Sequence, residues 1–266
     1  MKIKQYIVTY NNQIQINNCL ESIFSKLSNE ELSILDVYII NNHSNLTINE
    51  NYLDKVTILN NDLRPDFSTG HLSRNWNQAI INGFKDLNSP DCDIVITNQD
   101  DTLFKENYIN KIIELHNRFD LVQFGWGDNF ISYTPKAIKR IGLWDERFCN
   151  IGYQEADYLT RAALYLKNES CINDFSHNRM LNNIDEANWV IDIIPSGNAR
   201  NEGYHHTSSG FHSHSKHIYE AKWETNPDNG FLNIETLTPK MNSFILYPYF
   251  EKNIDTLDEQ YFIYKF

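Results

Sequence analysis

The chain has 266 residues, of which 41% are hydrophobic and 13% aromatic, a composition typical of a folded globular protein. Its 35 acidic and 23 basic residues give a formal net charge of −12, which argues against nucleic acid or an anionic membrane as the main partner, because both attract clustered Lys and Arg. No apolar run approaches the roughly 20 residues that span a bilayer. With no secretory signal and no CxxC spacing among its four cysteines, we expect a cytoplasmic protein with free thiols and no transmembrane segment.

Strand-like and helix-like segments alternate along the first half of the chain. Short apolar runs predict strands at residues 3–9, 35–40, 56–59, 94–97 and 121–124. Apolar residues at helical spacing predict amphipathic helices within 16–27, 72–83 and 108–116. This alternation implies right-handed βαβ crossovers, so we predict an α/β fold with a mainly parallel, twisted sheet flanked by helices.

The pattern loosens beyond about residue 180, where Asn, Gly, Ser and His dominate before an aromatic-rich tail. We therefore expect one catalytic core over residues 1–180. A C-terminal extension over residues 181–266 is expected to complete the site.

The most informative segment is DIVITNQDD, residues 93–101, in which a β-branched run stops at the adjacent carboxylates Asp100 and Asp101. Ligands of open α/β sheets bind beyond the carboxyl ends of the strands, so these acids should face a crevice shared with Thr9 and Asn41. Two carboxylates in that place can hold a hard divalent cation, which can in turn hold a diphosphate. The alternative is that the pair only forms a turn or caps a helix.

These segments resemble the GT-A glycosyltransferases of the large inverting group called family 2, over residues 3–225. Residues 8–11 (VTYN) look like the end of the family's first strand, and residues 39–45 (IINNHSN) resemble its VDNGSTD segment. Asn41 stands where an acid usually accepts the N3–H of uracil or thymine, and its amide oxygen can still accept that bond. The resemblance implies nucleotide-sugar-binding roles for Thr9, Tyr10, Asn11, Asn41, Arg74, Asn98 and Asp100.

Residues 98–101 (NQDD) resemble the DxD motif of that family, with Asn98 in place of the first acid. The resemblance implies that Asp100 and Asp101 bind the metal, which would be Mn²⁺ or Mg²⁺ because carboxylate, water and phosphate oxygens suit such cations. A C-terminal histidine often completes the metal site in GT-A enzymes, and His205 or His206 is the candidate here. The alternative is that these histidines belong to a solvated loop.

A second block, residues 141–148 followed by 152–161, looks like the family sequence GxFDExF…EDxDLxxR. The alignment places Glu155 where the catalytic Asp normally stands, so Glu155 is the predicted base and Asp157 the reserve candidate. The alternative is that these acids only stabilise the start of a helix. Residues 219–223 (YEAKW) resemble a late KW element of rhamnosyltransferase-like branches.

The resemblance implies a metal-dependent enzyme that transfers a sugar, with inversion, from a UDP- or dTDP-linked donor to an acceptor hydroxyl in glycan or polysaccharide synthesis. Trp126, Trp144 and Tyr153 are candidates for stacking on sugar rings, with core packing as the alternative. Three other functions remain open. They are a non-catalytic nucleotide-sugar-binding relative, a metal-dependent hydrolase built on the histidines, and a sugar-nucleotidyltransferase, although residues 10–13 (YNNQ) lack the glycine and lysine that a phosphate loop requires.

Overall fold

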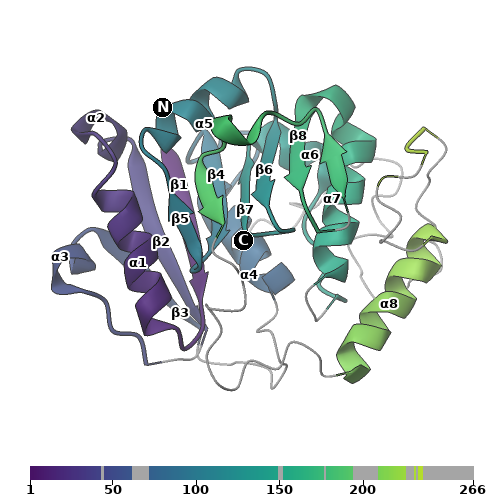
Figure 1. The fold of residues 1–266 in the computed structure, drawn as a ribbon, viewed down its shortest axis with the longest axis horizontal. Helices are drawn as coiled ribbons and strands as arrows, with labels where there is room; N and C mark the ends of the chain where they lie inside the picture. The colour runs from purple at the N-terminus through teal and green to yellow at the C-terminus, as the bar shows by residue number, and fades with distance from the viewer. Residues whose placement is uncertain are drawn as a thin grey trace.

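A computed structural model describes residues 1–42, 45–61, 72–148, 152–176, 178–193, 209–225, 231 and 233–235. Its main sheet has eight strands in the order β3-β2-β1-β4-β7-β6-β8-β9 (Figure 1). These strands are β1 (Ile3–Thr9), β2 (Leu35–Asn42), β3 (Val56–Asn61), β4 (Ile94–Gln99), β6 (Leu121–Gly125), β7 (Phe130–Tyr133), β8 (Ser170–Asp174) and β9 (Arg179–Leu181). Six strands run in one direction and only β7 and β9 oppose them. The predicted α/β class with a mainly parallel sheet is therefore confirmed.

The helices connect and cover these strands. They are α1 (Gln13–Phe24), α2 (Asn29–Leu32), α3 (Glu50–Leu53), α4 (Leu72–Phe84), α5 (Tyr108–His116), α6 (Pro135–Ile141), α7 (Tyr153–Leu166) and α8 (Ser209–Trp223), with short 3₁₀ turns η1 (Lys167–Glu169) and η2 (Glu186–Asn188). A separate antiparallel pair joins β5 (Thr102–Phe104) to β10 (Ile191–Ile193). All five predicted strands and all three predicted helices are present within a few residues of the expected bounds.

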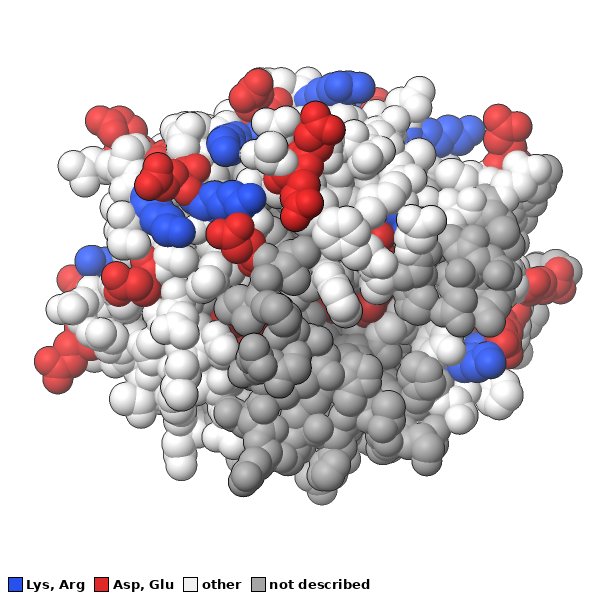
Figure 2. Space-filling model, in the orientation of Figure 1, with Lys and Arg blue, Asp and Glu red and all other residues white. Residues whose placement is uncertain are grey.

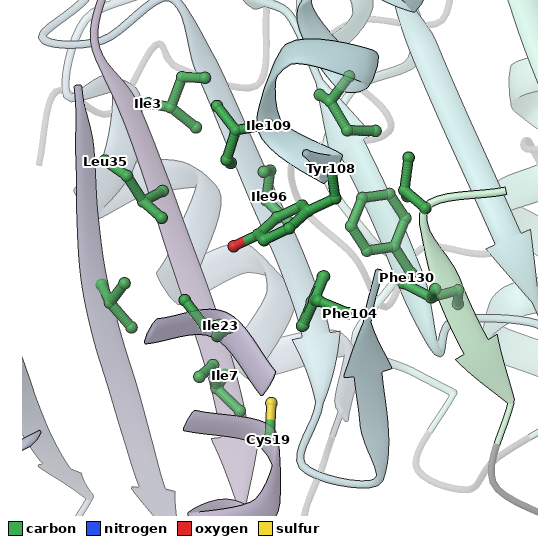
Figure 3. Close-up of a cluster of buried hydrophobic side chains, with 14 of the residues drawn as sticks. Ile3, Ile7, Cys19, Ile23, Leu35, Ile96, Phe104, Tyr108, Ile109 and Phe130 are labelled. Carbon is green, nitrogen blue, oxygen red and sulfur yellow. The ribbon is translucent and has the colours of Figure 1, made fainter. Parts of the chain in front are cut away.

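Two hydrophobic layers lie on opposite faces of the main sheet, because side chains alternate along each strand. In β4, Ile94 and Ile96 pack with α1, α5 and the β5–β10 pair, whereas Val95 packs with α4, α6 and α7. Figure 3 shows part of the first layer, in which Ile7 lies near Cys19 of α1 and Ile96 lies near Tyr108 of α5. Full burial of each such aliphatic side chain contributes about 1.5–3 kcal/mol, which makes the sheet a firm base for residues at the strand ends.

The antiparallel strand β7 was not predicted, and it shapes the sheet at the carboxyl end of β4. β6 and β7 form a hairpin whose turn contains Gly125 and Gly127, with φ of +93° and +59°. Glycine adopts positive φ without the steric penalty of a side chain, so these two residues permit the tight reversal. β7 inserts between β4 and β6, with Phe130 opposite Asn98, and this register places the hairpin turn beside the carboxyl end of β4.

Two of the described elements after residue 181, β10 and α8, pack on the core. β10 pairs with β5, and α8 lies against α7 at the edge of the molecule (Figure 1). The division into a core at 1–180 and an extension at 181–266 stays a prediction. In the part of the chain that the structure describes, no helix has the length and apolarity needed to cross a membrane. On the face shown in Figure 2, the described Lys and Arg side chains stand among Asp and Glu side chains rather than in a basic patch.

Candidate active site

Asp100 is fixed at the carboxyl ends of β1 and β4. Thr9 Oγ1 donates a hydrogen bond to Asp100 Oδ2 at 2.6 Å, and Asn12 Nδ2 lies 3.4 Å from Asp100 Oδ1. Asn12 is the residue before α1, and its side chain bonds Asp100 instead of capping the helix. Asp100 itself lies in a turn that leads into β5, so the turn interpretation of this acid applies and the helix-cap interpretation does not.

The electrostatic surroundings of Asp100 favour a bound positive charge. Burial raises the pKa of Asp100 to about 8, the neighbouring Asp101 adds to the increase, and the hydrogen bonds from Thr9 and Asn12 oppose it. A cation next to this carboxylate would stabilise its ionised form. An acidic pair in which the pKa of one carboxyl group is raised in this way, at the end of a strand, is a common sign of a functional site.

Asp101 is the second carboxylate of this pair, and it faces the β6–β7 hairpin turn. Its Oδ1 accepts a hydrogen bond of 3.3 Å from Asn129 Nδ2. Among the described residues, no group of three or more His, Cys, Asp and Glu side chains is placed to hold a metal ion. Two carboxylates nevertheless suit Mg²⁺ or Mn²⁺, because such cations commonly take their other ligands from water and substrate phosphates. His205 and His206 lie outside the described residues.

Side-chain amides form pairs at the neighbouring strand ends. Asn41 lies beside Thr9 in the sheet, and its Nδ2 donates to Asn60 Oδ1 at 2.9 Å. On the opposite face of the same strands, Asn61 Nδ2 donates to Asn42 Oδ1 at 2.9 Å and to Gln78 Oε1 at 3.0 Å. These amides offer both hydrogen-bond donors and acceptors at the carboxyl ends of β2 and β3.

Tyr10, Asn11 and Arg74 have more open positions around this edge. The Tyr10 side chain is 41% exposed, and Asn11 has a φ of +49°, which turns the chain from β1 into α1. Arg74 lies in the first turn of α4, where its Nε is 3.9 Å from Glu146 Oε2. This solvent-exposed guanidinium remains accessible to an anionic ligand.

Asn98 faces the core, in contrast to the predicted contact with a nucleotide sugar. Its side chain is fully buried, its Oδ1 accepts a hydrogen bond of 2.9 Å from Gln5 Nε2, and its Nδ2 lies 3.6 Å from Cys19 Sγ. The alternation of β4 sends Asn98 to the same face as Ile94 and Ile96. The structure therefore places Asn98 in the core beneath β4; its contact with a nucleotide sugar stays a prediction, and it is not carried into the proposed site.

Glu155 occupies the first turn of α7, close to the hairpin turn. Its Oε2 accepts a hydrogen bond of 3.0 Å from the Gly152 N–H, so the helix-start interpretation applies to this residue. Its Oε1 lies so close to Gly127 that a Cβ built on Gly127 would be 2.5 Å away. The side chain is 8% exposed, which leaves the carboxylate at the border between interior and surface.

Asp128 is a second buried carboxylate in this region, and no sequence motif singles it out. Trp76 Nε1 donates to Asp128 Oδ2 at 2.8 Å, and Gln99 Nε2 donates to Asp128 Oδ1 at 2.6 Å. Burial raises the pKa of Asp128 to about 6, and these hydrogen bonds oppose the increase. Burial and the charge of Asp128 raise the pKa of Glu155 to about 8, against the opposing charge of Arg179.

Asp157, the reserve candidate for the base, is committed to a buried ion-pair network. It receives hydrogen bonds from Arg161 Nε at 3.0 Å and from Trp223 Nε1 at 2.9 Å, and Lys222 Nζ lies 2.7 Å from its Oδ1. Lys222 Nζ also lies 3.0 Å from Asp145 Oδ2. These contacts hold α8 against the core, and they argue against Asp157 as a proton acceptor because two cations neutralise its charge.

A continuous set of contacts links the Asp100–Asp101 pair to Glu155. Asp101 contacts Asn129, and the residue that precedes Asn129 in the hairpin, Asp128, contacts Gln99 at the end of β4. Gly127 then packs on Glu155. The cation-binding candidates and the raised-pKa carboxylate thus share one edge of the sheet. An arrangement of this kind can hold an anionic leaving group at one end and accept a proton at the other.

The sequence matches no protein-family model and no curated protein. Among solved structures, the chain is similar to the mannosyltransferase PcManGT from Pyrobaculum calidifontis in complex with GDP-Man and Mn²⁺, with 14% identity, a TM-score of 0.46, and coverage of 65% of this chain and 55% of that chain. It is also similar to S. aureus TarS, with 13% identity, a TM-score of 0.46, and coverage of 65% and 35%.

A third similar structure is S. aureus TarS 1–349 in complex with UDP-GlcNAc, with 12% identity, a TM-score of 0.44, and coverage of 63% of this chain and 55% of that chain. The chain thus spans about half or less of the length of these structures. Similarity at this level identifies no family, and the fold assignment rests on the strand order and register. That the chain belongs to family 2, or to a rhamnosyltransferase-like branch of it, stays a prediction.

Proposed function

We propose that this chain is a metal-dependent inverting glycosyltransferase of the GT-A type, which transfers a sugar from a UDP- or dTDP-linked donor to an acceptor hydroxyl in glycan synthesis. The observation that carries the proposal is the placement of Glu155, a carboxylate with raised pKa, on the same sheet edge as the Asp100–Asp101 pair. The motif order from residue 8 to residue 161, which resembles that of family 2, is consistent with this geometry.

The donor would lie along the carboxyl ends of β1, β2 and β4. Asn41 would accept the imide N–H of the base, and Thr9, Tyr10 and Asn11 would line the nucleoside at the β1–α1 turn. Arg74 would contribute a positive charge near the nucleotide sugar, since a guanidinium pairs well with phosphate oxygens.

Asp100 and Asp101 would hold Mn²⁺ or Mg²⁺. When bound, the cation neutralises the charge that develops on the departing diphosphate. Thr9 and Asn12 orient the Asp100 carboxylate through their hydrogen bonds, so this ligand is positioned before the donor arrives. Such preorganisation reduces the reorganisation needed during the reaction.

Glu155 would act as the general base. The acceptor oxygen forms a bond to the anomeric carbon on the side opposite the diphosphate, the bond from that carbon to the diphosphate oxygen breaks, and the hydroxyl proton passes to Glu155. A base works best when its pKa lies near the working pH, and burial together with Asp128 brings the pKa of Glu155 into that range. The Gly152 N–H and the surface of Gly127 fix the direction of the carboxylate.

Thermal-shift titration followed by a transfer assay tests this function. The wild-type chain should be stabilised by a UDP- or dTDP-sugar in the presence of Mn²⁺, because ligands that bind only the folded state raise its stability. UDP-GlcNAc, which is bound in a similar solved structure, is a first donor to test, whereas stabilisation by GDP-Man alone would contradict a UDP- or dTDP-linked donor. The Glu155→Gln variant should keep this stabilisation and lose transfer by a factor of about 10² or more.

Glu186→Gln is the matched control, since Glu186 is an exposed acid distant in sequence from the proposed site. It should behave like the wild-type chain in both measurements. Donor binding without any transfer or donor hydrolysis in the wild-type chain would instead favour the non-catalytic nucleotide-sugar-binding relative. Wild-type turnover in Glu155→Gln would refute the assignment of the base.

A further inference from the structure

Trp126 is the exception among the tryptophans of this chain. The chain has five, and four of them are at most 3% exposed, whereas Trp126 is 53% exposed. The other two aromatic candidates from the sequence analysis are buried: Trp144 stacks on Tyr158 with ring centroids 4.1 Å apart, and Tyr153 is 8% exposed. Core packing therefore accounts for Trp144 and Tyr153 but leaves Trp126 unexplained.

The hairpin turn holds Trp126 in a well-defined position. Gln123 Nε2 donates to the carbonyl oxygens of Gly125 and Gly127, at 3.2 and 2.8 Å, and the Gly127 N–H donates to Asp174 Oδ1 at 2.7 Å. The Trp126 N–H itself donates to Asn129 Oδ1 at 3.0 Å. Because its backbone groups are satisfied within the protein, the turn presents a large aromatic surface that loses little conformational entropy on binding.

Trp126 directly precedes the residue of the turn that packs on the proposed base. The following residue, Gly127, is the one that packs directly on the Glu155 carboxylate. On the other side, the Phe175 N–H donates to the Gly125 carbonyl at 3.3 Å. Phe175 is 41% exposed and is backed by Trp189, with ring centroids 4.8 Å apart. A ligand that lies on the indole of Trp126 would therefore contact the same turn whose next residue packs on Glu155.

We propose that Trp126 is the acceptor platform, on which a neutral pyranose ring stacks with one hydroxyl directed toward Glu155. This inference rests on the proposed transferase function and specifies its acceptor. The C–H groups on one face of a pyranose are apolar and slightly positive, so they match the negative face of an aromatic ring. The buried carboxylates Asp128, Glu155 and Asp174 surround this turn, and together with the net charge of −12 they disfavour a polyanionic acceptor.

Fluorine NMR on the full chain labelled with 5-fluorotryptophan tests binding without any need for turnover. The Trp126 resonance is identified by its loss in Trp126→Phe. Titration with methyl β-glucoside, methyl β-galactoside and methyl α-mannoside should move this resonance in a saturable way for at least one of them. Sorbitol, which has no ring, should leave it unchanged. Failure of all three glycosides to move the resonance selectively would overturn the inference.

Steady-state kinetics provide the second test. Trp126→Ala should raise the acceptor KM by about tenfold or more, the range that stacking on an aromatic side chain reaches by alanine substitution, and leave the donor KM unchanged. Trp126→Phe should recover part of the loss, because it retains an aromatic face. Leu53→Ala, which truncates a similarly exposed side chain (51%) in α3, should have no effect.

The two tests separate the inference from the function on which it rests. Transfer that is unaffected by Trp126→Ala would refute the acceptor platform and leave the transferase proposal intact. A saturable shift of the Trp126 resonance in a chain that transfers no sugar would refute the transferase proposal and retain Trp126 as a pyranose-binding residue.

Discussion

Gly127 and Glu155 are in such close contact that a methyl group on Gly127 would lie 2.5 Å from Glu155 Oε1 and 2.6 Å from its Cδ. Real Cβ atoms do not approach other atoms this closely, so a side chain at residue 127 must displace either the turn or the carboxylate. The direction of Glu155 is thus determined by a glycine on a different element, as well as by the N-terminal turn of its own helix.

Gly127→Ala should reduce transfer sharply. The substitution forces the Glu155 carboxylate out of position and also strains a backbone with φ of +59°, so we expect at least a tenfold fall in kcat and a loss of about 1–3 kcal/mol of stability. Gly142→Ala is the control, because it carries comparable strain at φ of +82° at the C-terminal end of α6, on a residue that the proposed site does not use. Equal kcat losses in the two variants would show that strain, not displacement of Glu155, is responsible.

The pH dependence of transfer should report the raised pKa of Glu155. If Glu155 is the base, kcat/KM should rise with pH and level off above about 8, where the carboxylate is ionised. Asp128→Asn removes the neighbouring negative charge, so the rise of kcat/KM with pH should occur about one pH unit lower. If the rise of kcat/KM occurs at the same pH in Asp128→Asn as in the wild-type chain, the two acids do not influence each other as proposed.

Unfolding measurements check the same pKa independently of activity. The folded-state pKa of Glu155 lies above the value of 4.5 of an unperturbed glutamate, so the folded chain holds a proton that the unfolded chain releases. This residue therefore contributes stability that is fully present below about pH 4.5 and is lost as the pH rises toward about 8. In Glu155→Gln, the free energy of unfolding by urea should fall less over this interval than in the wild-type chain.

The metal site predicts a difference between Asp100→Asn and the wild-type chain. Mn²⁺ with a nucleoside diphosphate should raise the melting temperature of the wild-type chain, and EDTA should abolish the rise; Asp100→Asn should show neither effect. Without ligand, Asp100→Asn should be at least as stable as wild type above pH 8, because it removes a buried charge that desolvation disfavours. Stabilisation of Asp100→Asn by Mn²⁺ equal to that of wild type would exclude Asp100 as the principal ligand.

The sequence predicted the sheet and the nucleotide edge because their signals are local. β-branched runs that end in polar residues, such as the one before Asp100, define strands and their carboxyl ends without knowledge of distant contacts. β7 and Asp128 were missed, because a four-residue strand carries little periodicity and its antiparallel place between β4 and β6 depends on long-range pairing. The clearest local signal of the β6–β7 hairpin was residues 125–129 (GWGDN), because two glycines and an Asp-Asn sequence are typical of a hairpin turn.

Asp157 and Asn98 show the limit of reasoning from motifs. Both were assigned functional roles by their place in a pattern, yet each is buried against partners far away in the sequence. Lys222 and Trp223, which bond Asp157, lie 65 and 66 residues further along the chain (222 − 157 and 223 − 157). Only the docking of α8 on α7 distinguishes a buried ion pair from a catalytic acid, and no local pattern encodes that contact.

Lys222 should be among the most important residues for the stability of α8. Its Nζ lies between Asp145 and Asp157, and all three side chains are fully buried, so removal of the ammonium leaves two acids without their shared partner. Breaking a buried pair in this way costs about 3–5 kcal/mol, which we expect for Lys222→Ala in urea unfolding of the full chain. Lys216→Ala, on an exposed position of the same helix, should cost no more than about 0.5 kcal/mol.

The same network predicts that Asp157→Asn lowers stability yet retains transfer per folded molecule, whereas Glu155→Gln loses transfer. Loss of transfer in a folded Asp157→Asn variant would return Asp157 to the list of candidate bases.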